Sequence, residues 1–395
     1  MQIIVTCLFG LESLVGEDIL ALGYEREQIR VIDGQVNLDV PLEQVPRAVA
    51  QLNLWVSTGE RVLVEVAEFP AATFDELFDH MEKVNWEDYI ADGSAFHING
   101  YSRKSALFGI SACQSIAKKA IVKRLLQKKG GGDILAEDPQ KGLLKIQLAI
   151  VSDRVSVRID TTGDGLHKRG YRPLSNVAPI RETLAAGLVR LSRYIAGRNE
   201  ALVDPFCGSG TIVIEAARAA CGIAPGLQRR FSAEKWFFIG AEIFDEERKK
   251  AKEQVRMPIS EQIYFYGSDI DPQAVQIAVR NAETAGVGAI VRFKEADALN
   301  QDLDTILNWT KLERALIICN PPYGERLLSV EEAETIYRGI GKLYLTNSGT
   351  CKKGSRLSVI SPDDTFEKVI GFRADKRRKL YNGNIKCQMY HYHKL

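Results

Sequence analysis

One pattern recurs in the second half of the chain, an apolar strand followed by a polar loop and a helix, and it restricts the possible folds more than any other feature. It occurs in "EALVDPFCGSGTIVIEAARAA" and "QIYFYGSDIDPQAVQIAVRNAETAG", and further strands are expected in "RALIICNPPYG" and "SRLSVISP". Apolar strands that alternate with helices specify a doubly wound α/β sheet of parallel strands. Asn382 and Gly383 lie between two strand-like runs of the tail, which predicts an antiparallel hairpin at the end of that sheet.

The first 160 residues follow a different, α+β pattern. Strands are expected at 2–8, 61–69 and 96–101, and a helix at 13–22. A basic helix within 102–132 ends at three glycines, and alternating strands follow at 143–150 and 154–160. The stretch 161–179 is rich in glycine and basic residues, so we expect the boundary between the two regions there.

Charge is distributed unevenly along the chain. Residues 1–100 carry 5 Lys and Arg against 18 Asp and Glu, whereas residues 101–172 carry 15 against 6. A basic segment after an acidic one suggests a face that binds a polyanion, although a solvated helix face explains the charge equally well. The candidate cations of the basic helix are Lys118, Lys119, Lys123, Arg124, Lys128 and Lys129.

Several other classes of protein are disfavoured. Composition is 45% hydrophobic, yet no uninterrupted apolar stretch reaches the roughly 18 residues that cross a bilayer. The N-terminus lacks the basic region of a signal peptide, so a cytoplasmic protein is expected. None of the seven cysteines forms a C-x-x-C pair, so we expect core thiols and neither a disulfide framework nor a metal site.

The loop "VDPFCGSGT" is a candidate cofactor site. Gly208 and Gly210 would let the backbone approach a ligand, and the helix that starts near Thr211 would point its N-terminus at it. A dinucleotide fingerprint would need glycine in place of Val213, and a phosphate-binding Walker loop would need lysine before Thr211. The acid Asp204 suits a ligand with an ammonium group, such as S-adenosylmethionine (SAM); an ordinary tight turn is the alternative.

Two further acids follow successive strands. Asp269 could accept both ribose hydroxyls of a nucleoside, and Ile270 offers an apolar surface for adenine. Asp297 could bind the adenine amino group. The separation of Asp269 from the glycine loop is about 60 residues instead of roughly 20, which predicts an insertion between them.

The segment "NPPY" follows another buried strand, where parallel sheets bind their ligands. The Asn320 side-chain oxygen and the Pro321 carbonyl could both accept hydrogen bonds from one amino group and aim its lone pair at a methyl donor. Pro321 and Pro322 would fix the backbone, and Tyr323 would offer a ring for a flipped base. A proline turn that merely closes the strand is the alternative.

The motifs "DPFCGSGT", "GSDID", "NPPYGERL" and "HKRGYR...APIRETLAAGL" together resemble RNA methyltransferases that join a THUMP domain to a SAM-dependent catalytic domain, in particular the bacterial guanine-N2 methyltransferases of 23S rRNA. The resemblance implies a ferredoxin-like segment at 1–45, a THUMP domain at 46–160 and a Rossmann-like methyltransferase domain at 165–395. It adds Phe206 to the SAM-lining set and implies RNA, 23S rRNA or a ribosome precursor, as the partner. Some members carry a second fused methyltransferase, which we do not expect here.

The basic stretch near the boundary could then clamp RNA phosphates through Lys168, Arg169 and Arg172, with His167 beside them and Tyr171 stacking on a base. A merely solvated linker explains these residues equally well. Arg181, at the start of the next helix, is a weaker candidate for closing over SAM.

Three functions remain open from the residues. The first is methylation of guanine N2 in RNA, and the second uses the same chemistry on adenine N6 of DNA or on a glutamine side chain. The third is an RNA-binding protein with a vestigial SAM domain, which the intact acids, glycines and Asn320 oppose.

Overall fold

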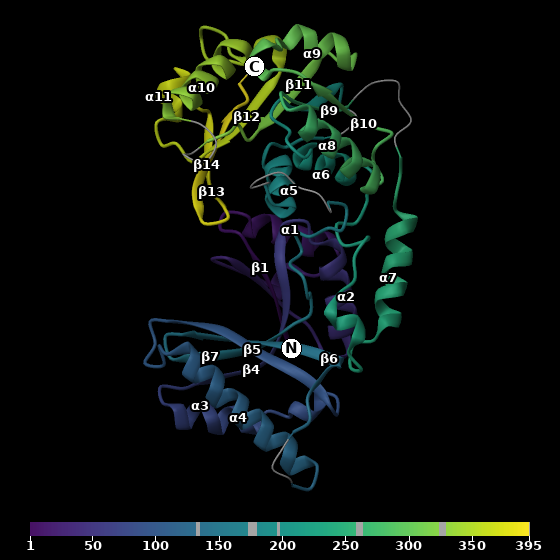
Figure 1. The fold of residues 1–395 in the computed structure, drawn as a ribbon, viewed down its shortest axis with the longest axis vertical. Coiled ribbons are helices and arrows are strands. Elements are labelled where there is room, and N and C mark those ends of the chain that lie inside the picture. Colours follow the sequence, from purple (N-terminus) through teal and green to yellow (C-terminus); the bar gives the residue numbers. More distant parts are fainter. Residues whose placement is uncertain (132–134, 173–179, 196–197, 258–263, 324–328, 395) are drawn as a thin grey trace. The chain divides into compact units, whose positions relative to one another are not determined.

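A computed structural model describes residues 1–394 apart from 132–134, 173–179, 196–197, 258–263 and 324–328, and apart from the side chains at 140 and 141. The chain forms two compact units (Figure 1). The first comprises residues 1–7, 16–166 and 230–250, and the second comprises 8–15, 167–229 and 251–395. The prediction of an α+β region followed by an α/β region is confirmed.

The first unit is built on one sheet with the strand order β2-β3-β1-β4-β7-β6-β5. Within this sheet β5 and β6 are the only described neighbours that pair in parallel, and the other neighbours are antiparallel. The long strand β4 pairs with both β1 and β7, so it joins the N-terminal strands to the later ones in a single sheet. The strands are β1 (Gln2–Cys7), β2 (Ile29–Ile32), β3 (Gln35–Asp39), β4 (Gly59–Pro70), β5 (Ser94–Arg103), β6 (Asp138–Val151) and β7 (Arg154–Asp160).

Capping and glycine signals mark the ends of two helices in this unit. Helix α3 begins with a capping box, in which the Thr73 hydroxyl accepts a hydrogen bond from the Glu76 amide and the Glu76 carboxylate accepts one from the Thr73 amide. Helix α4 ends where Gly130 and Gly131 adopt positive φ, as the glycine run predicts. The helices are α1 (Glu12–Ala21), which contributes to both units, η1 (Arg26–Gln28), η2 (Leu42–Gln44), α2 (Val45–Trp55), α3 (Phe74–Lys83), η3 (Trp86–Asp88), α4 (Ile110–Lys128), η4 (Ser232–Lys235) and α7 (Ala241–Glu253).

The second unit contains the expected parallel sheet, with the order β10-β9-β8-β11-β12-β14-β13. Strands β10, β9, β8, β11 and β12 are parallel. Strands β14 and β13 are antiparallel additions, and the turn that joins them contains Gly383 with φ +61°. The predicted C-terminal hairpin is therefore confirmed (Figure 1). The strands are β8 (Glu200–Asp204), β9 (Phe265–Asp269), β10 (Val291–Glu295), β11 (Arg314–Cys319), β12 (Arg356–Ser361), β13 (Lys376–Asn382) and β14 (Ile385–Tyr392).

Alternate residues of the central strands enter two separate cores, because successive side chains of a strand point to opposite faces. Leu316 and Ile318 of β11 lie in one core, and Ala315 and Ile317 lie in the other. Burial on both faces explains why these strands read as continuous apolar runs. The helices are α5 (Glu182–Leu191), α6 (Thr211–Ala220), α8 (Pro272–Thr284), η5 (Ala298–Asn300), α9 (Leu303–Thr310), α10 (Val330–Tyr344), η6 (Lys352–Gly354) and α11 (Phe366–Ile370).

The predicted insertion between the glycine loop and the second strand is confirmed in an unexpected form. Residues 230–250, which include η4 and most of α7, group with the first unit and not with the sheet that they interrupt. Within that unit, the Arg248 guanidinium contacts the Glu234 carboxylate, and Arg47 approaches Glu247 at 3.7 Å. The insertion therefore contributes structure to the N-terminal unit.

Candidate active site

The glycine loop joins β8 to α6, and its two glycines have different roles. Both have positive φ, +51° at Gly208 and +82° at Gly210. A Cβ atom on Gly210 would lie 2.7 Å from Phe293 Cζ, so close packing requires glycine there. A Cβ atom on Gly208 would meet nothing within 4 Å. Open space over Gly208 allows a ligand to approach the backbone.

The carboxylate of Asp269 is held against this loop. Its Oδ2 accepts the Gly208 amide at 2.8 Å, and its Oδ1 accepts the Asp271 amide at 3.0 Å. Each oxygen of a carboxylate has a second lone pair, so both remain able to accept ribose hydroxyls. Ile270, beside it, is 69% exposed, and its contact with adenine stays a prediction.

Asp204, at the end of β8, is a buried acid without a cation among the described residues. It is 1% exposed, and its Oδ1 accepts the Phe206 amide at 3.0 Å. Burial raises the pKa of Asp204 to about 8, and the neighbouring charge of Asp269 adds to the shift. An uncompensated buried carboxyl beside an open loop fits a ligand that carries positive charge, as SAM does.

Asn320 follows β11, the strand that pairs with β8 in the sheet. Its Oδ1 is buried and accepts no hydrogen bond from any residue that the structure describes. A buried oxygen without a donor costs free energy unless a ligand supplies one. The free acceptor is compatible with the amine-orienting role of Asn320, which stays a prediction. Pro321 is buried after it and Pro322 is half-buried.

Tyr323 is partly buried against the core on one face of the sheet. Its hydroxyl accepts a hydrogen bond of 2.8 Å from Asn382 Nδ2 at the turn of the β13–β14 hairpin. Burial raises the pKa of Tyr323 well above its ordinary value. The stacking role of this ring stays a prediction. Residues 324–327 of the quoted motif lie outside the described residues.

Two of the predicted cofactor residues are engaged locally. Asp297 Oδ1 accepts the Leu299 amide at 2.9 Å and its Oδ2 accepts Asn300 Nδ2 at 2.8 Å, so it caps η5 after β10. Thr211 Oγ1 accepts Arg172 Nη1 at 2.9 Å. Both stand at the expected strand or helix ends, and their ligand contacts stay predictions.

Some supporting residues gave no signal in the sequence. Gln301 donates to Ser268 Oγ at 2.9 Å and accepts the Tyr266 hydroxyl at 2.7 Å, which braces the strand before Asp269. Asn281 Nδ2 donates to the Ser209 carbonyl at 3.0 Å and holds the glycine loop. These pairs are 33 to 72 residues apart in the chain, so local patterns cannot reveal them.

Most of the cations on α4 are already paired with carboxylates. Arg124 lies 2.6 Å from Glu87 and lowers the pKa of that carboxyl to about 2. Lys119, by contrast, has no ion pair within the described parts of the chain. It lines an open hollow of about 690 Å³ with Lys118 and Lys123. The remaining pairs are Lys118 with Glu137, Lys123 with Glu82, Lys128 with Glu87, and Lys129 with Asp92. The acidic N-terminal residues therefore offset much of the basic helix, and its contact with RNA stays a prediction.

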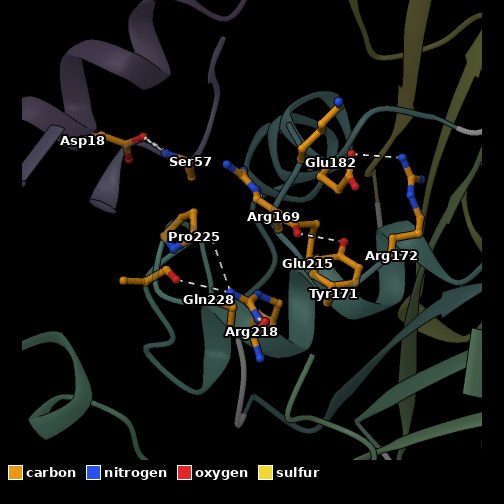
Figure 2. A network of polar contacts seen from close by, with 12 residues as sticks. Asp18, Ser57, Arg169, Tyr171, Arg172, Glu182, Glu215, Arg218, Pro225 and Gln228 are labelled. Carbon is orange, nitrogen blue, oxygen red and sulfur yellow. Dashed lines mark hydrogen bonds and ion pairs between the residues drawn. The ribbon is translucent and has the colours of Figure 1, made fainter. Parts of the chain in front are cut away.

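The expectation for the boundary stretch requires correction (Figure 2). Arg169 is 1% exposed and pairs with Glu215 at 3.4 Å, and the Tyr171 hydroxyl donates to the same carboxylate at 2.9 Å. Arg172 lies 3.0 Å from Glu182. The buried Arg169 and Tyr171 cannot clamp RNA phosphates or stack on a base in this structure, and the partly buried Arg172 is held by Glu182. Of the three predicted cations only Lys168 is exposed. Residues 173–179 lie outside the described part.

Comparison with known families assigns the architecture. Residues 169–391 match the family described as "RMKL-like, methyltransferase domain", which is more than half of the chain. The chain belongs to this methyltransferase family. Residues 2–63 match the "RlmL ferredoxin-like domain" and residues 71–160 match the "THUMP domain". The predicted combination of ferredoxin-like, THUMP and methyltransferase domains is confirmed, and the boundaries at 45 and 160 stay proposals.

Curated relatives cover almost all of this member of the RMKL-like family. "Putative RNA methyltransferase YpsC" of Bacillus subtilis (strain 168) is 38% identical over 391 residues, which are 99% of this chain and 95% of the relative. "Ribosomal RNA large subunit methyltransferase K/L" of Psychromonas ingrahamii is 32% identical over 97% of this chain. The chain spans only 49% of that K/L relative.

A solved structure supports the fold and the cofactor class of this RMKL-like protein. The crystal structure of SMU.472, "a putative methyltransferase complexed with SAH", superposes with a TM-score of 0.86 at 34% identity, and covers 100% of this chain and 98% of its own. SAH is the demethylated form of SAM, so the expectation of a SAM-dependent family is confirmed. Asp204, Gly208 and Asp269 fit such a ligand by charge, open space and free lone pairs.

No helix among the described residues is long and apolar enough to span a membrane. Nor do the described His, Cys, Asp and Glu side chains form a group that could hold a metal ion. All seven cysteines are buried and free of disulfides.

Proposed function

We propose that this chain transfers a methyl group from SAM to the exocyclic N2 amine of a guanine in RNA, with 23S rRNA or a ribosome precursor as the substrate in the cytoplasm. The observation that carries the proposal is the buried Oδ1 of Asn320, which has no hydrogen-bond partner among the described residues, at the end of the strand beside the glycine loop. It supplies an acceptor for an amino group where a parallel sheet binds its ligands.

In this proposal the residues of the loops divide the work. Asp204 and Asp269 hold SAM through its positive charge and its ribose, with Gly208 allowing close approach and Ile270 facing the adenine. When bound, SAM supplies the electrophilic methyl group. Asn320 Oδ1 and the Pro321 carbonyl accept hydrogen bonds from the substrate amine and orient the nitrogen lone pair. The nitrogen becomes acidic once methylated, so no strong general base is required.

The RNA substrate is supported by the THUMP match and by the names of the relatives, which describe RNA and large-subunit ribosomal RNA methyltransferases. Guanine N2 as the target atom is supported by the sequence resemblance alone. Methylation of adenine N6 would use the same Asn320 acceptor, so only product analysis separates the two.

The test is transfer of tritium from labelled SAM to total RNA from a strain that lacks this gene, followed by digestion to nucleosides and mass spectrometry. Label in N2-methylguanosine of the 23S fraction is the expected result. An Asn320→Ala protein serves as the control for contaminating methyltransferases.

Other products would overturn parts of the proposal. Label in N6-methyladenosine would overturn the target atom, and label in DNA or protein alone would overturn the RNA substrate. No label in any fraction, together with loss of SAM binding by the purified chain, would favour a vestigial domain.

A further inference from the structure

A basic and aromatic surface lies on the β13–β14 hairpin of the methyltransferase unit, and no residue of it was among the predicted RNA contacts. It consists of Phe9, Lys379, Tyr381 and Lys386, which we call the hairpin patch. Tyr381 pairs with Lys386 across the hairpin, and Lys379 stands two residues before Tyr381, so these three side chains share one face. The chain after Asp375 contains no acidic residue.

The aromatic members of the patch are close to one another, with Phe9 exposed and Tyr381 partly exposed. The Phe9 and Tyr381 ring centroids are 5.7 Å apart, and Phe9 is 50% exposed. The Lys379 ammonium lies 5.5 Å from the Tyr381 centroid. Exposed rings beside cations are the combination that single-stranded nucleic acid binds, because every base can stack while the cations contact phosphates.

Ion pairing distinguishes this patch from the basic helix α4. Neither Lys379 nor Lys386 has a carboxylate partner among the described residues, and both are exposed. Five of the six candidate cations on α4 are paired. A cation that is already paired with a carboxylate gains less free energy from contact with a phosphate. The hairpin patch therefore attracts a polyanion more strongly than α4 does.

The patch also lies beside the motif that would present the target base. Strand β12 pairs with β14 as far as Ser361 and Gln388, so residues 385–387 of β14 extend past the end of β12, at the edge of the sheet where β11 leads into the motif (Figure 1). The turn is fixed to that loop by the hydrogen bond from Asn382 to Tyr323.

We propose that the hairpin patch binds the single-stranded RNA that flanks the target nucleotide. Lys379 and Lys386 contact its phosphates, and Phe9 with Tyr381 stacks on a neighbouring base. This inference rests on the proposed function, because it assumes that the substrate is RNA.

The test measures binding and methyl transfer separately, with the full chain and a synthetic RNA stem-loop that carries guanines in its loop. We expect Tyr381→Ala and Phe9→Ala each to weaken RNA binding by about 5-fold to 100-fold. Lys379→Ala with Lys386→Ala should lower the slope of log affinity against log salt by about 1.4, or roughly 0.7 per phosphate contact. Lys342→Ala, an exposed cation in the last turn of α10, is the matched control and should leave the slope unchanged.

Thermal melting and SAM binding of each variant identify variants that fail to fold. If the unmodified protein binds the RNA and all the patch variants bind it equally well, the patch is wrong whether or not methyl transfer occurs. If the unmodified protein binds RNA through the patch but methylates only DNA or protein, the proposed function fails, and with it the placement of the patch beside a target nucleotide, whereas the patch remains an RNA-binding surface. Absence of RNA binding by the unmodified protein overturns both.

Discussion

Asn382 Nδ2 donates a hydrogen bond of 2.8 Å to the Tyr323 hydroxyl, which joins the hairpin turn to the loop that follows β11. The two residues are 59 positions apart in the chain. Tyr323 cannot therefore move without either breaking this bond or carrying the turn with it, so the hairpin controls the position of the ring next to Asn320.

Removal of this bond should slow turnover without weakening SAM binding. A hydrogen bond of this kind contributes about 1 kcal/mol, so Asn382→Ala and Tyr323→Phe should each lower the rate by about 5-fold. Both variants together should lower it no more than either alone, because they remove the same interaction. A rate that falls by the product of the two single effects would show that the residues act independently.

Asn320→Ala should abolish methyl transfer while SAM binding survives, because it removes the acceptor for the substrate amine. We expect a loss of about 100-fold or more in kcat, measured under saturating SAM. Asn320→Asp, which keeps an acceptor oxygen, should retain more activity than Asn320→Ala. Near-normal turnover of the alanine variant would make the amine-orienting role wrong.

Asp269→Ala should weaken SAM binding directly, since it removes the acceptor proposed for both ribose hydroxyls and releases the Gly208 amide. Hydrogen bonds to a charged group contribute about 1.5 to 3 kcal/mol each, so the Kd should rise by at least about 10-fold. Titration calorimetry measures this, with Asp271→Ala, which keeps the Asp269 carboxylate, as the comparison. An unchanged Kd in Asp269→Ala would contradict the assignment.

SAM affinity should rise with pH below the pKa of Asp204, which burial raises to about 8. The cation binds best to the ionised carboxylate, so affinity should increase by about 10-fold or more between pH 6 and pH 7.5. Asp204→Asn should bind weakly at every pH and show a flat profile. A pH dependence that persists in Asp204→Asn would assign the effect to another group.

The same shift affects the stability of the ligand-free protein. The folded state holds a proton on Asp204 that the unfolded chain releases above its ordinary pKa of 3.8. The contribution of this residue to the free energy of unfolding should therefore decrease as the pH rises from about 4 to about 8. Thermal melts of the native and Asp204→Asn proteins, compared across that range, measure it.

Acid should destabilise the second unit through two histidines, the buried His391 and the partly buried His393. Ser358 Oγ lies 2.9 Å from His391 Nδ1 and 3.1 Å from His393 Nε2, and burial lowers their pKa values to about 3 and about 4. Both pKa values are depressed on folding, so the unfolded chain binds more protons and stability is lost as the pH falls from about 6.5 to about 3.

His391→Gln should make this acid dependence of the melting temperature shallower. His97→Gln, at an exposed position of β5, is the matched control and should leave the dependence unchanged. Equal slopes in the native and His391→Gln proteins would show that other groups cause the acid sensitivity.

Local patterns were sufficient for much of this protein. Alternation of apolar strands and helices predicted the parallel sheet, because burial on both faces imposes it on the sequence itself. The hairpin, the glycine loop and the acids at strand ends are likewise determined over a few residues. The order of these motifs placed Asp204, Asp269 and Asn320 at one edge of the sheet, where the structure also has them.

Only the tertiary structure decided which charged groups are accessible. The α4 cations and the buried Arg169 look alike in sequence, yet their partners come from residues 19 to 46 positions away. Long-range packing also leaves Lys379 and Lys386 without a carboxylate partner among the described residues, and it brings Asn382 to Tyr323. Sequence determined the backbone architecture because hydrophobic periodicity is local, whereas the pairing of polar groups depends on which distant residues the fold brings together.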